Sequence, residues 1–233
     1  MRIAIISDSH GNLAALDAVL YDLDRNGPYD QVMMGGDVAY GGPFPANCIE
    51  RIRERGYPAV RGNTDQMIVD AARGTGDAHG NWVVEQLDDD AISYLDALPV
   101  QRQIEIDDGD VLGLVHATPW SIYDTVRPDS SDVDFRRMLK EAGTNALAYG
   151  HIHLQHQRSL ESGLVIAVGS VGLPFDGDQR AMYTVIEATA HGWNIDFRRV
   201  AYDVDSTQRA AAEHGGPNAE NFSRLVERAT PPG

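Results

Sequence analysis

Two polar segments that lie far apart in the chain carry the side chains best suited to chemistry. Each follows an apolar run typical of a buried strand and then presents two ligand-type side chains at alternate positions: Asp8 and His10 in one segment, His151 and His153 in the other. In an open α/β sheet, side chains that directly follow the strands meet in the crevice outside the strand ends. Because carboxylate and imidazole groups bind metal ions, the two segments predict two halves of one metal site. Either segment taken alone is equally typical of a surface turn.

Other apolar runs end in residues of the same kind. Asp37, Asn63 and His116 each come shortly after such a run, so we expect them to lie at the same edge. This repeated placement favours a metal site over scattered polar residues on the surface. The complete set of predicted metal ligands is Asp8, His10, Asp37, Asn63, His116, His151 and His153.

The elements that must position these residues begin with an α/β pattern. Apolar residues recur at helical spacing after the first two strand-length runs, from Leu13 to Leu23 and at Ile49 and Ile52. Strand, loop and helix in succession indicate parallel strands. The three strands expected in this part are 2–7, 31–34 and 58–60.

The rest of the chain predicts more strand than helix. Residues 75–98 have helical spacing, and within them 88–90 is interpreted as the acidic first turn of a helix. A further helix is expected at 132–141. The later strands are expected to pair mostly antiparallel, at 101–106, 110–115, 154–160, 164–168, 181–187 and 193–200, with a turn at 107–109. We predict one domain over 1–205 and a helical or partly disordered tail over 206–233.

Charge and composition limit the partners. The chain has 233 residues and a formal net charge of −16, which disfavours a nucleic-acid polymer or an anionic membrane, because both require clustered Lys and Arg. A small phosphate ester or nucleotide substrate, held through metal ions, remains compatible. The single cysteine, Cys48, excludes an intramolecular disulfide and a thiolate metal cluster. No membrane-length apolar run and no signal-peptide pattern is present, so we expect a cytoplasmic protein, of undetermined oligomeric state.

The order of the motifs resembles that of the calcineurin-like metallophosphoesterase superfamily, and within it the bacterial phosphodiesterase and diadenosine tetraphosphatase-like branch. The family pattern is D-x-H, G-D, G-N-H-[DE], a lone H and G-H-x-H. Here these motifs stand as Asp8-Ser9-His10, Gly36-Asp37, Gly62-Asn63-Thr64-Asp65, His116 and Gly150-His151-Ile152-His153. The resemblance extends from Met1 to about Val200. It implies an α/β fold, a four-layer α-β-β-α sandwich of two mixed β-sheets flanked by helices.

Transfer along these motifs implies a dinuclear metal centre. One ion would be held by Asp8, His10, Asp37 and His153, and the other by Asp37, Asn63, His116 and His151. The shared carboxylate of Asp37 offsets part of the repulsion between two ions that lie about 3.5–4 Å apart. The mixed nitrogen and oxygen donors favour Mn²⁺, with Fe or Zn²⁺ as alternatives. Such a centre implies a phosphoesterase in which a metal-bound hydroxide attacks phosphorus without a protein nucleophile.

The sequence departs from the family pattern at Thr64, where many members have a histidine that is expected to protonate the leaving oxygen. Threonine cannot act as this acid. The predicted substrates therefore shift toward activated phosphodiesters, nucleotides and phosphoanhydrides, with dinucleoside polyphosphates as one candidate class. His79 is the first alternative proton donor, and an exposed loop histidine is the competing interpretation, because only geometry qualifies a donor. The predicted catalytic residues are Asp37, Asn63, Thr64 and His79.

Three residues are weaker candidates for substrate contact. Asn12 precedes a helix whose N-terminus is suited to a phosphate, or it acts only as the N-cap. Arg61 offers a planar fork for a phosphate oxygen, or it forms a structural ion pair. Tyr40 offers a ring for a base or aryl group, or it packs against Pro43 and Phe44.

Three other functions compete with phosphodiester hydrolysis. A protein-interaction scaffold on the same fold, as in the retromer subunit, tends to lose metal ligands, whereas every ligand position is filled here. A nuclease of the Mre-type branch is disfavoured by the acidic balance of the chain. A phosphomonoesterase or phosphatase remains an alternative.

Overall fold

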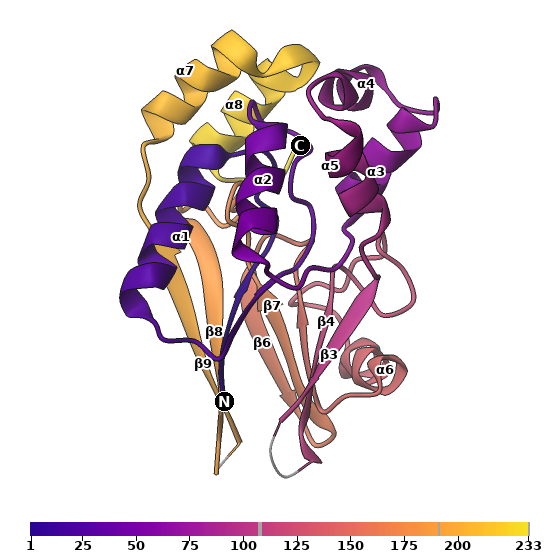
Figure 1. Ribbon diagram of the computed structural model, residues 1–233. Helices are drawn as coiled ribbons and strands as arrows, with labels where there is room; N and C mark the ends of the chain where they lie inside the picture. The colour runs from indigo at the N-terminus through magenta and orange to yellow at the C-terminus, as the bar shows by residue number, and fades with distance from the viewer. Residues whose placement is uncertain (107–108, 191, 233) are drawn as a thin grey trace.

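A computed structural model describes residues 1–106, 109–190 and 192–232. It consists of two mixed β-sheets packed face to face (Figure 1). The first sheet has the order β2 (Gln31–Met34), β1 (Arg2–Ile6), β8 (Ala181–Thr189) and β9 (Gly192–Val200). The second has the order β3 (Gln101–Glu105), β4 (Val111–Val115), β5 (Ala146–Tyr149), β7 (Gly163–Val168) and β6 (Gln155–Leu160).

Helices cover the outer face of each sheet, which makes four layers. The first sheet is covered by α1 (Leu13–Asn26) and α2 (Pro45–Arg55). Helices α3 (Asn63–Ala72), α4 (Ala78–Glu85) and α5 (Asp89–Asp96) belong to the same apolar cluster but lie toward one end of the molecule (Figure 1). The second sheet is covered by α6 (Asp132–Ala142), which lies on the opposite side of the molecule (Figure 1). The predicted α-β-β-α sandwich is therefore confirmed.

The central strand β1 shows why the layers form. Its side chains alternate between the two faces of the sheet, as in any strand. Ile3 and Ile5 pack in the apolar layer between the sheets, whereas Ala4 and Ile6 pack against the helices. All four are buried, so β1 reads as a continuous apolar run, as expected for a strand covered on both faces.

The prediction of a strand over 58–60 is wrong. Ala59 forms only an isolated parallel bridge to Met34. Pro58 has no backbone N–H to donate, which restricts pairing, although its carbonyl accepts from Met34 and Val60 N–H donates back to the Met34 carbonyl. The segment therefore extends the edge of the first sheet beside β2 without forming a strand of its own.

The mostly antiparallel pairing expected for the later strands is confirmed in part. Strands β3 and β4 form the predicted antiparallel pair, although Asp107 and Asp108 of the expected turn lie outside the described residues. Strands β6 and β9 also pair antiparallel with β7 and β8. The central pairs β4–β5 and β5–β7 are parallel, so the second sheet is mixed, with its parallel strands in the middle.

The helical stretch expected over 75–98 is divided into α4 and α5. Asp88 ends the connection between them and caps α5, since its carboxylate accepts a hydrogen bond from the Ala91 N–H at 2.7 Å. Asp89 and Asp90 lie in the first turn. There they interact favourably with the positive end of the helix dipole, as the sequence predicted.

The C-terminal part forms α7 (Val204–His214), a 3₁₀ turn η2 (Gly216–Asn218) and α8 (Ala219–Arg228). Phe222, Val226 and Ala211 pack with Leu173 in a separate apolar cluster. Figure 1 shows α7 and α8 at the end of the molecule that also holds α4. The division into a domain over 1–205 and a tail stays a prediction. Among the described residues, no helix has the length and apolar character needed to cross a membrane.

The layer between the sheets predicts the effect of a core truncation. Ile166 on β7 is fully buried there, so Ile166→Ala is expected to lower the free energy of unfolding by about 2–5 kcal/mol. Val133→Ala is the control, because Val133 on α6 is 65% exposed and should change stability by less than about 0.5 kcal/mol. Urea denaturation of both variants measures this, and equal losses would contradict the packing described.

Candidate metal centre

The ends of four strands bring the predicted ligands to one place. Asp8 follows β1, Asp37 follows β2, His116 follows β4 and His151 follows β5. These strands belong to both sheets, so the cluster lies where the two sheets meet at their carboxyl ends. Asn63 comes from the first residue of α3.

One part of the cluster combines two imidazoles with a carboxylate. His10 Nε2 lies 3.2 Å from His153 Nε2. Asp8 Oδ1 lies 3.3 Å from His153 Nε2 and 3.8 Å from His10 Nε2. All three side chains are buried, and their atoms are close enough to bind a single ion together.

A second part of the cluster is centred on Asn63. Its Oδ1 lies 3.0 Å from His116 Nε2 and 2.9 Å from His151 Nδ1. The two parts meet at Asp37, whose Oδ2 lies 3.4 Å from His116 Nε2 and 3.6 Å from His10 Nε2. Asp8, Asp37 and His116 also form a group able to bind one ion. The structure thus brings all seven predicted ligands together.

Hydrogen bonds to carbonyl groups set which ring nitrogen faces the cluster. The Nδ1 atoms of His10 and His153 lie 2.7 and 2.6 Å from the carbonyl oxygens of Tyr40 and Leu173, and His116 Nδ1 lies 2.8 Å from that of Gly35. A carbonyl can only accept, so each Nδ1 donates a proton. The neutral form of each imidazole then turns a lone pair on Nε2 toward the carboxylates.

This arrangement fits divalent cations. The Nε2 lone pairs of His10 and His153 face each other beside two buried carboxylates, which is unfavourable unless positive charge lies between them. Metal-binding histidines ordinarily donate their other ring N–H to a carbonyl or carboxylate, as seen here. Neutral imidazoles with carboxylate and amide oxygens form a donor set suited to transition metals.

The backbone of the ligands is strained. The φ angles are +57° at Asp8, +48° at His10, +56° at Asp37, +65° at His151 and +57° at His153. Among the described residues, Ala229 is the one further non-glycine residue with a positive φ. Each such residue costs on the order of 1–3 kcal/mol and persists where the surroundings enforce it, commonly at functional sites.

Burial and charge together determine which ligands are ionised. Burial opposes ionisation of Asp37 and Asp8, but neighbouring histidines lower the pKa of both carboxyls below the usual value. Burial lowers the pKa of His10 and of His151. Burial also opposes a charge on His116, but the Asp37 carboxylate raises the pKa of this imidazole to about 10. Binding of an ion through His116 Nε2 therefore requires release of its proton.

Asp65 holds the turn that carries Asp37. Its carboxylate accepts from the backbone N–H groups of Asp37 (2.8 Å), Val38 (2.9 Å) and Gly62 (2.8 Å). Burial and the Asp37 charge raise the pKa of Asp65 to about 6. Asp65 was not among the predicted site residues, although it is the fourth residue of the motif that contains Asn63.

Two glycines permit the close approach of these loops. A Cβ on Gly62 would lie 2.0 Å from Asp37 Oδ1, and a Cβ on Gly150 would lie 2.5 Å from Asp8 Oδ2. Any side chain at either position would displace a ligand carboxylate. This explains why the motifs of Asn63 and His151 have glycine directly before the ligand.

Comparisons with known proteins place this cluster in a family. Residues 1–191 match the model of the Calcineurin-like phosphoesterase superfamily domain. The chain belongs to this superfamily. An uncharacterized protein of Methanocaldococcus jannaschii, MJ0912, is 30% identical over 224 residues, which cover 87% of this chain and 88% of that protein.

Two solved structures share the fold of this phosphoesterase chain over nearly its full length. The metallophosphoesterase of Sphaerobacter thermophilus has a TM-score of 0.79 at 28% identity, with 99% of each chain covered. The protein PH1004 of Pyrococcus horikoshii has a TM-score of 0.84 at 19% identity, with 97% of each chain covered. The first supports the metallophosphoesterase assignment, and the second shows the fold.

The structure shows how Thr64, the residue at which the sequence departs from the family motif, is held. Its backbone N–H donates to Asp37 Oδ1 at 2.9 Å, so the residue helps to orient that carboxylate. Its hydroxyl is buried and has no hydrogen-bond partner among the described residues. Nothing in this environment gives the hydroxyl the acidity of an imidazolium.

His79 is not the exposed loop residue that the competing interpretation required. It lies in α4 and is 6% exposed, with its ring against those of Tyr40 and Trp82. Its Nε2 accepts a hydrogen bond from the Gly41 N–H at 3.2 Å, so in the neutral ring the proton is on Nδ1. Nδ1 is buried and has no partner among the described residues.

The three weaker candidates for substrate contact all form hydrogen bonds within the protein. Asn12 caps α1 by accepting from the Ala15 N–H, and its amide donates to the Gly172 carbonyl. The guanidinium of Arg61 donates to Gln66 Oε1 and to the Asp96 carbonyl, and it forms an ion pair with the Asp96 carboxylate at 3.8 Å. These observations favour the N-cap and ion-pair interpretations.

Tyr40 is held by contacts that neither interpretation anticipated. Its hydroxyl donates to the Asp77 carboxylate at 2.8 Å, and its ring meets the edge of His79. Its carbonyl orients His10. A role of Tyr40 in substrate contact stays a prediction.

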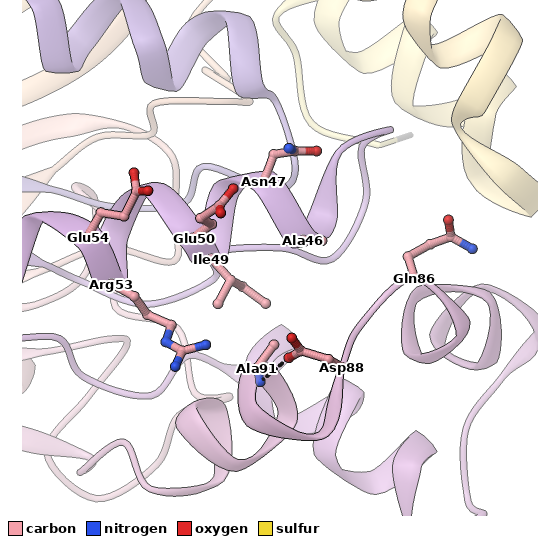
Figure 2. Close-up of a pocket in the computed structure, with 9 residues that line it drawn as sticks. All are labelled: Ala46, Asn47, Ile49, Glu50, Arg53, Glu54, Gln86, Asp88 and Ala91. Carbon is pink, nitrogen blue, oxygen red and sulfur yellow. Dashed lines mark hydrogen bonds between the residues drawn. The ribbon is translucent and has the colours of Figure 1, made fainter.

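A polar groove elsewhere on the surface is separate from the cluster. It has a volume of about 600 Å³ and lies between α2 and α5. Figure 2 shows Glu50, Arg53 and Glu54 of α2 on one side and Asp88 and Ala91 on the other. None of the predicted ligands lines it, so the groove is not part of the candidate metal centre.

The contacts of Asp65 predict a loss of both stability and metal affinity in Asp65→Asn. The amide would turn an N–H toward backbone donors, which should lower the free energy of unfolding by about 1–3 kcal/mol. Metal affinity should fall by about 10–100-fold, as is typical when support around ligands is lost. Asp70→Asn, whose carboxylate accepts from Gln66 on the same helix, is the control. Denaturation and Mn²⁺ titration test this, and equal behaviour of the two variants would contradict it.

Proposed function

We propose that this protein is a two-metal phosphoesterase that hydrolyses phosphodiester or phosphoanhydride bonds of small substrates. The observation that supports this most is the convergence of the imidazole Nε2 atoms of His10, His116 and His153 on the buried carboxylates of Asp8 and Asp37, with the second ring nitrogens held by carbonyl groups. Membership of the phosphoesterase superfamily supports the reaction class.

The ligands would divide between two metal positions. Asp8, His10, Asp37 and His153 would hold the first ion, and Asp37, Asn63, His116 and His151 the second. Asp8 and Asp37 both lie near the middle of the cluster. Asp37 would contribute to both positions, because one of its oxygens lies near both His10 and His116, whereas Asp8 Oδ1 lies near His153 and His10.

Two divalent ions, which we propose to be Mn²⁺ with Fe or Zn²⁺ as alternatives, supply Lewis acidity toward the phosphate oxygens and make a water molecule more acidic. The protein fixes the geometry. The carbonyls of Gly35, Tyr40 and Leu173 keep the imidazoles in the tautomer that can bind metal. Asp65 holds the backbone of Asp37, and the surrounding contacts keep the ligand loops in their left-handed conformations.

The substrate class follows from the missing proton donor. An alkoxide is a poor leaving group without a proton, whereas an aryl oxide or a nucleoside phosphate leaves more readily. Because Thr64 has a buried hydroxyl and the neutral form of His79 has its proton on a buried nitrogen, we propose activated phosphodiesters and nucleotide anhydrides as substrates, including dinucleoside polyphosphates. We propose that His79 supports the Tyr40–Gly41 backbone and does not protonate the leaving group.

Turnover of bis(p-nitrophenyl) phosphate tests the proposed activity. We expect Mn²⁺-dependent release of p-nitrophenol that falls by more than about 100-fold in Asp37→Ala, since a ligand should cost more than the 10–100-fold typical of outer partners. Asp70→Asn is the matched control and should keep activity. Full activity of Asp37→Ala would contradict the assigned metal centre. Absence of wild-type turnover with every metal would contradict the proposed activity and favour a protein-interaction scaffold.

A series of aryl and alkyl phosphodiesters tests the absence of a general acid. The logarithm of kcat/KM should fall steeply as the pKa of the leaving group rises, because no donor neutralises the developing charge. His79→Gln, which offers an oxygen acceptor to Gly41, should keep the same slope, with its rates changed equally for all substrates. A shallow slope in the wild type that steepens in His79→Gln would identify His79 as the acid instead.

A further inference from the structure

We propose that the C-terminal segment, residues 204–229, positions the ligands of the first metal position and has little effect on the second. This inference rests on the proposed two-metal function. The segment lies beyond the part of the chain that matches the family model, which ends at residue 191. Its contacts nevertheless reach the backbone and rings around His10 and His153.

The contact with His10 passes through the loop at 40–42. The Tyr40 carbonyl accepts the His10 Nδ1 proton. At the next residue, the Gly41 carbonyl accepts a hydrogen bond from Asn218 Nδ2 at 3.1 Å, while Gly42 N–H donates to the His10 carbonyl at 2.8 Å. Asn218 therefore holds the peptide that follows the carbonyl on which the orientation of His10 depends.

The ring of Phe222 packs against the same loop and restricts its movement. This residue of α8 is fully buried, and its Cζ lies 2.8 Å from the position that a Cβ on Gly42 would occupy. The loop is therefore in close contact with the Phe222 ring and cannot move toward the C-terminal helices. A smaller side chain at this position would let the 40–42 loop move away from His10.

The contact with His153 passes through residues 173–177. The Leu173 carbonyl accepts the His153 Nδ1 proton at 2.6 Å, and the Phe175 ring stacks on His153 with centroids 4.3 Å apart. Both residues pack against the cluster that contains Phe222 and Val226. The backbone of this loop is also bound to the segment, since Gly177 N–H donates to the Ala229 carbonyl.

The second position is supported by other elements. His116 is oriented by the Gly35 carbonyl, at the end of β2. His151 lies 3.4 Å from the hydroxyl of Thr125, in the loop before α6, and Asn63 begins α3. Among the described residues, the hydrogen bonds of these three side chains involve no member of 204–229.

The two positions should therefore respond differently to variants of the segment. Loss of an outer partner typically weakens metal binding by about 10–100-fold, because the ring and its lone pair are no longer fixed. Asn218→Ala removes the donor to Gly41, and Phe222→Leu loosens the packing of both loops. Thr125→Val is the reciprocal variant, directed at the second position. Glu220→Gln, an exposed change on α8, is the control.

Titration of the full-length protein with Co²⁺, followed by proton NMR, separates the positions. A bound paramagnetic ion shifts the Nδ1–H signals of the imidazoles that bind it, and His10 and His153 report on the first position while His116 reports on the second. In Asn218→Ala and Phe222→Leu, half-saturation of the His10 and His153 signals should require about tenfold more Co²⁺. The His116 signal should change by less than about twofold.

Each other outcome has a defined meaning. Thr125→Val should weaken the His116 signal selectively, and Glu220→Gln should match the wild type. Equal weakening of both positions by Asn218→Ala and Phe222→Leu, or no weakening at all, would overturn the inference while leaving the two-metal function intact. Absence of shifted imidazole signals in the wild type would instead overturn the proposed function. Thermal unfolding shows whether each variant is folded. If only one of Asn218→Ala and Phe222→Leu is folded, that variant is enough for the test.

Discussion

The carboxylates and imidazoles of the ligand cluster repel one another, and the surrounding structure must hold them together. Two buried carboxylates and the lone pairs of several imidazoles point at one another, and burial of such groups is unfavourable without compensating positive charge. The Asp37 carboxylate raises the pKa of His116 and so favours one such charge beside it. His10 and His151 are not available for this purpose, because burial keeps their pKa values low. Divalent ions provide the remaining compensation in our account.

The fold holds these groups in place against their repulsion. Carbonyl groups fix the rings, Asp65 fixes the backbone of Asp37, and the glycines before the ligands let loops from two sheets approach closely. Five ligands have left-handed backbone conformations, whose cost must be met by packing elsewhere. The apolar layer between the sheets provides that packing, and the motifs at the strand ends can therefore be strained without loss of the fold.

Much of this arrangement could be predicted from the sequence, because it depends on local patterns. The apolar runs before Asp8, Asp37, His116 and His151 identified strands whose ends converge, and the motif order identified the family. The division of the 75–98 stretch at Asp88 and the failure of 58–60 to form a strand were less predictable. They depend on capping and on Pro58, whose effects compete with apolar periodicity.

Other features depend on contacts between residues remote in sequence, which periodicity does not encode. The carbonyls of Tyr40 and Leu173 become partners of His10 and His153 only after folding, and any residue type supplies a carbonyl. The burial of His79 on α4 follows from tertiary packing against Tyr40 and Trp82. Asp65 did carry a signal, since it stands in the same motif as Asn63, but its role in binding the Asp37 turn required the three backbone donors to be located.

Anomalous diffraction from crystals soaked in Mn²⁺ tests the central claim most directly. Two peaks about 3.5–4 Å apart, with Asp37 between them and His153 and His116 on opposite sides, are the result that this account predicts. A map without peaks in this cluster at saturating Mn²⁺, or one whose peaks lie away from Asp8 and Asp37, would contradict it.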